Sequence, residues 1–177
     1  MAGLASVISF IDGNAFSRRS VDAASRYDGR DFTSSEWALI DESPDGFRLR
    51  FIKGEKKTLG AGDIVALQPR ESSKIHVCLV RRIVSSQTRL EIGLQLLSPQ
   101  ITVVDVQGCD AQESRGILLH SLPAYGKFSG LIIPPGVYRA SEKIVIRLPG
   151  RSLHRLLGTC LEANEGLEFF TLEQLPD

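Results

Sequence analysis

Residues 37–51 read WALIDESPDGFRLRF, and this stretch decides the fold because it predicts two strands joined by a tight turn. The run before Asp41 is apolar, whereas most residues from Asp41 to Gly46 are of types that favour turns. After the turn, three apolar residues alternate with two arginines, which is the period-two pattern of a half-buried strand. The stretch therefore predicts a β-hairpin with a polar tip.

The polar tip brings together groups that can bind a ligand. Asp41 and Ser43 can hydrogen-bond backbone amides within the turn, and Gly46 suits a positive φ at the entry to the second strand. Arg48 and Arg50 lie two residues apart on one face of that strand, where they either face solvent or extend an anion site beside the turn. A carboxylate, a hydroxyl and backbone amides next to two arginines suit a polar, phosphate-bearing ligand.

The spacing of Asp41, Ser43 and Gly46 is D-x-S-x-x-G, which resembles the PilZ domain of bacterial cyclic di-GMP receptors. In that family an R-x-x-x-R motif lies before the first strand, and Arg26 and Arg30 have this spacing. The resemblance implies that both arginines contact the phosphates or stack on guanine, as guanidinium groups can. It also implies that Asp41 and Ser43 meet a guanine edge or a ribose, and that Gly46 lets the backbone approach the ligand.

The resemblance covers about residues 17–98, because three later apolar blocks are similar to PilZ strands. These blocks are residues 62–67, 75–84 and 90–97. The following residues continue in the same style, with strand-like runs near 101–106, 115–122, 129–136, 140–148, 154–161 and 167–172. Short strands at this spacing predict an all-β fold of two small antiparallel β-barrels, the first PilZ-like. We expect a PilZ-like barrel with an N-terminal extension in residues 1–98 and a second barrel in residues 99–177.

The first 16 residues are apolar without strong periodicity, and they fit either a strand or a docking helix. No helix longer than two turns is predicted anywhere in the chain. The apolar run has no basic segment before it and ends at Asp12, which argues against a signal peptide and a membrane span. In the first barrel, ten residues are expected to form the core: Trp37, Leu39, Phe47, Leu49, Val65, Leu67, Val77, Leu79, Ile92 and Leu94.

Composition argues against several classes of function. The 21 basic and 21 acidic residues balance, so there is no bulk attraction to nucleic acid or to an anionic membrane. Three widely spaced cysteines predict no disulfide framework and favour a reducing compartment, for which we expect the bacterial cytoplasm. The three histidines lack metal-ligand spacing, and no nucleophile motif, P-loop or dinucleotide fingerprint is present. We therefore expect a non-catalytic signalling protein without a metal or cofactor.

Two functional hypotheses stay open. In the first, the chain is a cyclic di-GMP sensor whose second barrel moves or changes partners when the ligand binds. In the second, it is a degenerate PilZ-like adaptor that binds only protein. The second hypothesis rests on spacing, because a whole strand separates the two motifs in the family, whereas Arg30 stands 11 positions before Asp41. Arg18 and Arg19 stand farther from the turn, but neither has an arginine four residues later.

Overall fold

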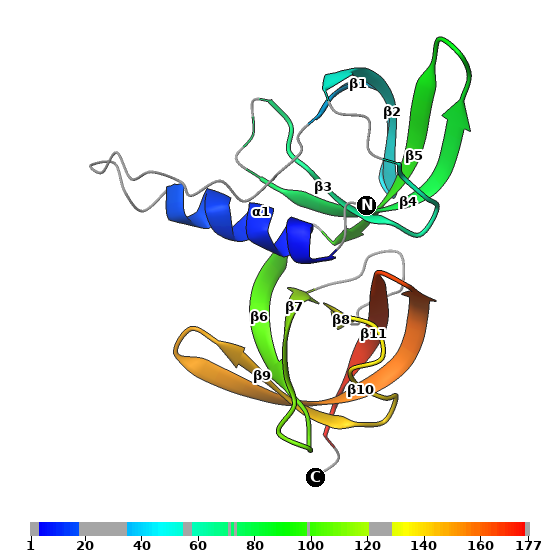
Figure 1. Cartoon of the computed structure of the whole chain (residues 1–177). Helices are drawn as coiled ribbons and strands as arrows, with labels where there is room; N and C mark the ends of the chain where they lie inside the picture. Colours follow the sequence, from blue (N-terminus) through cyan, green and yellow to red (C-terminus); the bar gives the residue numbers. More distant parts are fainter. Residues whose placement is uncertain are drawn as a thin grey trace.

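The computed structural model describes residues 4–17, 35–54, 58–70, 72, 74–98, 100–120 and 129–175. Figure 1 shows two β structures with one helix between them. Every strand pairing among these residues is antiparallel, and the all-β prediction is confirmed. Arg26 and Arg30, together with Arg18 and Arg19, lie outside the described residues.

The first sheet is a curled half-barrel of five strands in the order β1-β2-β5-β4-β3. Its strands are β1 (Ser35–Ser43), β2 (Gly46–Gly54), β3 (Ile64–Leu67), β4 (His76–Ser85) and β5 (Leu90–Ser98). β1 and β2 pair as the predicted hairpin, with Leu39 opposite Leu49. The concave side holds an apolar core of Leu49, Cys78, Val80, Ile92 and Leu94. Because residues 47–51 alternate, Phe47 and Leu49 point toward this core, whereas Arg48 and Arg50 point to the opposite face of the sheet.

The second sheet closes into a barrel in the order β10-β11-β8-β7-β6-β9. Its strands are β6 (Ile101–Gln107), β7 (Glu113–Leu119), β8 (Ser129–Ile133), β9 (Lys143–Leu148), β10 (Arg151–Asn164) and β11 (Leu167–Gln174). Ile144 and Ile146 lie in its core, and they alternate along β9 with the less buried Lys143, Val145 and Arg147. Closure leaves no free sheet edge, which protects the barrel from pairing with other chains. The domain division after residue 98 stays a prediction.

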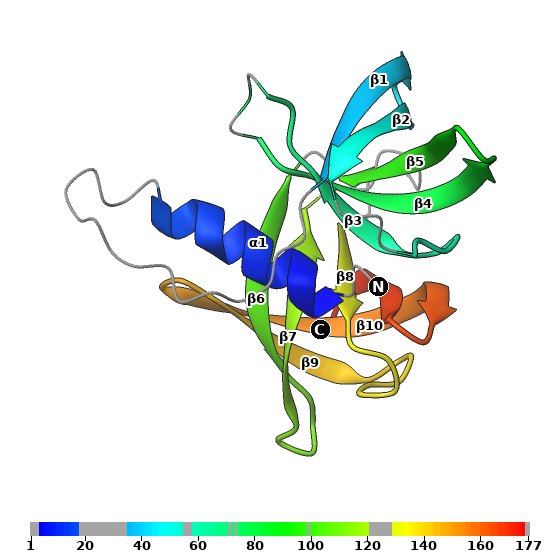
Figure 2. The ribbon, with the colours of Figure 1, turned by 45° about the horizontal axis from the view of Figure 1, so that its top comes forward.

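The N-terminal segment is a helix, α1 (Leu4–Ser17), of 14 residues. The prediction that no helix exceeds two turns is therefore wrong. Leu4, Val7 and Ile8 are buried, and Ile11 packs against the same cluster. Their spacing of three and four residues is the helical signature that the sequence carried. Figure 2 shows α1 lying between the half-barrel and the barrel.

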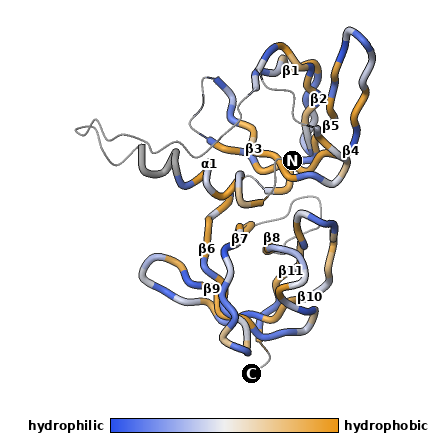
Figure 3. The backbone as a smooth tube through the Cα atoms, in the orientation of Figure 1, coloured by the Kyte–Doolittle hydropathy of each residue, from blue (hydrophilic) through white to orange (hydrophobic). Residues whose placement is uncertain are grey.

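An apolar cluster joins α1 to both β structures. Ile64, Val77 and Leu79 contribute from the half-barrel, and Ile117 and Phe169 are among those that contribute from the barrel. In Figure 3, β3 and the nearby ends of β6 and β7 are coloured as hydrophobic. The helix covers apolar surface of both sheets, so its burial stabilises their relative position.

The predicted core of the half-barrel is correct in part, because Val77 and Leu79 are buried in the cluster with α1 and the barrel and not in the half-barrel core. Leu49, Val77, Leu79, Ile92 and Leu94 are at most 5% exposed. Four of the other residues are half-buried, namely Trp37, Phe47, Val65 and Leu67. Leu39 is 56% exposed, so its predicted burial is wrong. It lies on β1, an edge strand beside a β-bulge, where the described residues cover it from one side only.

Candidate ligand-binding site

The D-x-S-x-x-G turn is a hairpin whose tip is held against the next strand of the sheet. Ser43 pairs with Gly46, so only Pro44 and Asp45 lie between the strands. The amide of Leu96 donates a 2.8 Å hydrogen bond to the carbonyl of Asp45. The hydroxyl of Ser43 lies 3.5 Å from the Gly46 carbonyl oxygen, a long contact. The hydroxyl and the exposed Asp41 are therefore oriented by backbone pairing, and both remain available to a ligand.

Gly46 is needed for a reason other than the one predicted. Its φ is not positive, unlike that of four other glycines in the described residues. Instead, a Cβ at this position would lie 1.9 Å from the carbonyl oxygen of Leu94. Only glycine allows β2 to approach β5 so closely. The predicted positive φ is wrong. The expectation that Gly46 lets the backbone approach a ligand stays a prediction.

A depression of about 420 Å³ opens beside the turn. Asp41, Ser43 and Gly46 line it together, as the sequence predicts for one site. Two arginines, Arg48 and Arg81, also line it. The part played by Arg26 and Arg30 falls outside the described residues.

Arg81 was not a predicted site residue. It forms a basic pair with Arg82, and such pairs usually face solvent. A β-bulge in β4 lies between Val80 and Arg82, and it shifts the strand register at Arg81. The Arg81 guanidinium donates 2.7 Å hydrogen bonds to Gln95 on β5 and to Glu162 on β10. No local sequence pattern predicts a bulge at this position, and Glu162, the partner of Arg81, is 81 residues away in the sequence.

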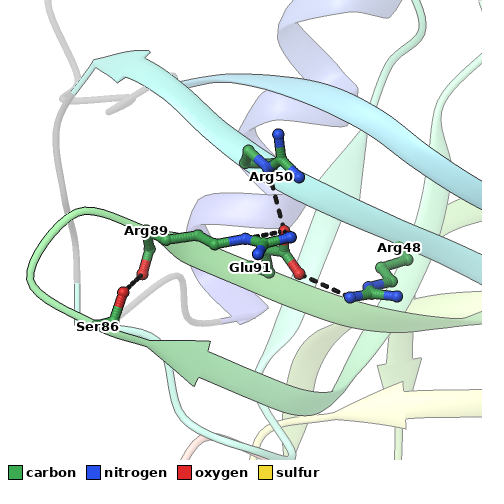
Figure 4. A network of polar contacts seen from close by, with 5 residues as sticks. All are labelled: Arg48, Arg50, Ser86, Arg89 and Glu91. Carbon is green, nitrogen blue, oxygen red and sulfur yellow. Dashed lines mark hydrogen bonds and ion pairs between the residues drawn. The ribbon is translucent and has the colours of Figure 1, made fainter.

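Arg48 belongs to a second cluster, shown in Figure 4, whose residues alternate along β2 and β5 with Leu49 and Ile92 of the half-barrel core. Arg48 donates to one oxygen of Glu91 at 2.9 Å, and Arg50 donates to the other at 3.1 Å. Arg89, in the turn just before β5, contacts the same carboxylate. The Glu91 side chain is only 3% exposed, whereas each arginine is about half exposed.

Electrostatics fix Glu91 as an anion. Burial alone would raise the pKa of Glu91, but the hydrogen bonds from Arg48, Arg50 and Arg89, together with the charge of Arg89, lower it from 4.5 to about 2. Three cations around one carboxylate leave a net positive charge on this face. Glu91 therefore orients both Arg48 and Arg50, but only Arg48 lines the depression beside the turn. The extension of an anion site by these two arginines stays a prediction.

Three further features of the described residues concern metal ligands, membrane spans and cysteines. Among them, no group of three or more His, Cys, Asp or Glu side chains is arranged to hold a metal ion. The same part of the chain contains no helix long and apolar enough to cross a membrane. Cys78, Cys109 and Cys160 are all free thiols.

The structure presents the D-x-S-x-x-G hairpin beside arginines on a curled antiparallel sheet, the arrangement that the PilZ resemblance implies. A protein-family model described as "Cyclic-di-GMP receptor FimW, middle PilZ domain" matches residues 10–102, more than half of the 177 residues. The chain therefore belongs to this family, and the PilZ resemblance is confirmed. The match begins within α1 and ends at the start of β6. Comparisons with curated proteins and with solved structures gave no match.

Proposed function

We propose that the chain is a signalling module that binds cyclic di-GMP in the depression beside the β1–β2 hairpin. One observation carries the proposal: Asp41 and Ser43 of the family motif line the same depression as Arg48 and Arg81. This combination offers acceptors for a guanine edge next to cations for a phosphate.

Each side chain has a role that its chemistry supports. The Asp41 carboxylate accepts hydrogen bonds from guanine N–H groups, and the Ser43 hydroxyl bonds a ribose or phosphate oxygen. Arg48 faces the phosphates with a guanidinium that Glu91 already holds in place. Gly46 keeps the hairpin tip close to β5 and thereby sets the shape of the depression. Following the family motif, we assign Arg26 and Arg30 to the remaining phosphate and guanine contacts.

The barrel of residues 101–174 is the proposed output element. It contributes no predicted ligand contact, yet Glu162 reaches from β10 to a residue that lines the depression. A ligand-dependent change at that point would be transmitted to a protein partner. The downstream partner is, on this proposal, a protein and not a nucleic acid.

Titration calorimetry with cyclic di-GMP tests the proposal. We expect binding at micromolar or tighter affinity, about −8 kcal/mol or more favourable. Asp41→Ala should weaken binding about tenfold or more by removing a charge-assisted hydrogen bond. The matched control is Asp110→Ala, which removes an exposed carboxylate from the β6–β7 turn.

Absence of ligand binding would contradict the proposed receptor function. At ~100 μM ligand, a micromolar binder would gain about 2.7 kcal/mol of stability. If calorimetry gives no heat and the melting temperature does not rise at that concentration, the chain is not a receptor. The degenerate adaptor that binds only protein then becomes the better description.

A further inference from the structure

We propose that Glu162 of the barrel is an internal competitor for the ligand, because it occupies the Arg81 guanidinium inside the proposed binding depression. Ligand phosphate and Glu162 then exclude each other at Arg81, and binding loosens the contact between half-barrel and barrel. This inference rests on the proposed function and adds a regulatory role for the second barrel.

The first step of the argument is the position of Arg81. The bulge in β4 places Arg81 on the wall of the depression that Asp41 and Ser43 also line. Its Nη1 lies 2.7 Å from Oε2 of Glu162, and its Nε bonds Gln95 at 2.7 Å. A single guanidinium thus serves both the site and the joint between the two β structures.

The second step is the charge of the depression. Its described lining includes three carboxylates, Asp41, Glu42 and Asp45, but only two arginines. Both arginines already contact glutamates, Arg48 with Glu91 and Arg81 with Glu162. Each arginine of this described lining is therefore already engaged by a carboxylate, and release of one of them would favour the binding of an anionic ligand.

The third step concerns which arginine can be released. Glu91 is 3% exposed and bonds three arginines, so that removing Arg48 from it would disrupt a buried network. The Arg81–Glu162 pair is 41% and 26% exposed at its two side chains. Solvent screens such a pair, and the pair is weak compared with a bidentate arginine–phosphate contact. Arg81 is consequently the cation that a ligand phosphate can capture.

The fourth step is how a change at Glu162 reaches the barrel. Two residues farther along β10, the side-chain amide of Asn164 donates a 2.9 Å hydrogen bond to the Gly62 carbonyl. The amide of Gly62 in turn donates to the carbonyl of Val80, the residue before Arg81. Glu162 and Asn164 therefore dock the tip of the β10–β11 hairpin onto one small region of the half-barrel. Loss of the Glu162 contact weakens this joint without opening either core.

Glu162→Gln tests the inference, with Glu113→Gln as the matched control. Glu113 also lies 2.7 Å from an arginine, Arg147, but on the barrel and outside the depression. Measured by calorimetry, Glu162→Gln should tighten cyclic di-GMP binding about two- to fivefold, the range expected from an exposed ion pair. Glu113→Gln should bind as the wild type does.

Because coupling is reciprocal, the ligand should weaken the joint by the same factor. Hydrogen exchange of the β10–β11 hairpin tip, residues 162–167, should therefore become faster when wild-type protein is saturated with cyclic di-GMP. In Glu162→Gln the ligand should produce a smaller change, since the joint is already loosened.

The outcomes separate the two proposals. If the wild type binds and Glu162→Gln binds equally or more weakly, the competitor role is overturned while the receptor function stands. Slower exchange at the hairpin tip on binding also overturns the competitor role. If neither protein binds, both proposals fail. Binding by Glu162→Gln alone supports the competitor role and shows that the barrel restrains the site.

Discussion

Truncation of Leu79 should reveal how firmly the helix, the half-barrel and the barrel are held together. Leu79 is 1% exposed and belongs to the cluster that includes Val7 of α1 and Phe169 of the barrel. Leu79→Ala removes buried methyl groups and leaves a cavity whose walls come from three separate elements. For such a site we expect a loss of ~3–4 kcal/mol in the free energy of unfolding. For a chain of this length, that loss lowers the melting temperature by roughly 6–16 °C.

Urea denaturation measures the loss through two signals. Far-UV circular dichroism follows the strands of both β structures, whereas fluorescence follows Trp37, the one tryptophan of the chain, on β1. Coincident transitions would show that both structures unfold as one unit. The matched control is Leu39→Ala, because Leu39 is 56% exposed and its truncation should change stability by ~0.5 kcal/mol or less. A loss below ~1 kcal/mol for Leu79→Ala would refute the shared-core interpretation.

Three further predictions follow from the same geometry. Gly46→Ala should lower the free energy of unfolding by ~1–3 kcal/mol, because the new Cβ would collide with the Leu94 carbonyl. Urea denaturation measures this loss, and an unchanged denaturation midpoint would contradict the close approach of β2 to β5. Glu91 has a folded pKa of about 2 against an ordinary 4.5, so its contribution is present above about pH 4.5 and is lost as the pH falls toward 2. Glu91→Gln should thus flatten the fall of stability in that range, and an unaltered acid profile would argue against the network. Burial raises the pKa of Cys78 to about 12, so a thiol reagent should label Cys109 and Cys160 in the native protein and Cys78 only after unfolding.

The β-hairpin of residues 37–51 was predictable because its signals are local. The turn-forming residues indicate two strands, and the alternation after Gly46 indicates the inward face of β2 without any distant contact, whereas the burial predicted for Leu39 on β1 is wrong. The closed barrel was predictable in outline for the same reason, since runs such as residues 143–148 alternate clearly. The sequence left a strand and a docking helix open for the segment that forms α1. Leu4, Val7, Ile8 and Ile11 have the helical period, but the surrounding residues are also apolar or small and obscure it.

The candidate site was predictable only in part. Asp41, Ser43 and Gly46 form a motif within six positions, and the structure brings them to one depression. The cluster around Glu91 depends on residues more than 40 positions apart, and Arg81 reaches its place through a bulge. Such pairings are decided by strand order and register, which single-sequence patterns leave open. The assignments of Arg26 and Arg30 remain predictions.

The two-sided burial of β4 has a consequence for how this strand finds its register. Val77 and Leu79 enter the cluster with α1 and the barrel, whereas Cys78 and Val80 enter the half-barrel core. A slip by one residue would exchange these faces while keeping most of them apolar, so alternation alone does not specify the pairing. The charge of Arg81 marks where the apolar run must stop, since a slip in that direction would bury an arginine. Arg81, the residue proposed to bind the ligand phosphate, therefore also helps to set the register of β4. The variant Arg81→Lys keeps the charge that sets the register but loses the guanidinium that would bind the phosphate, so it separates these two roles.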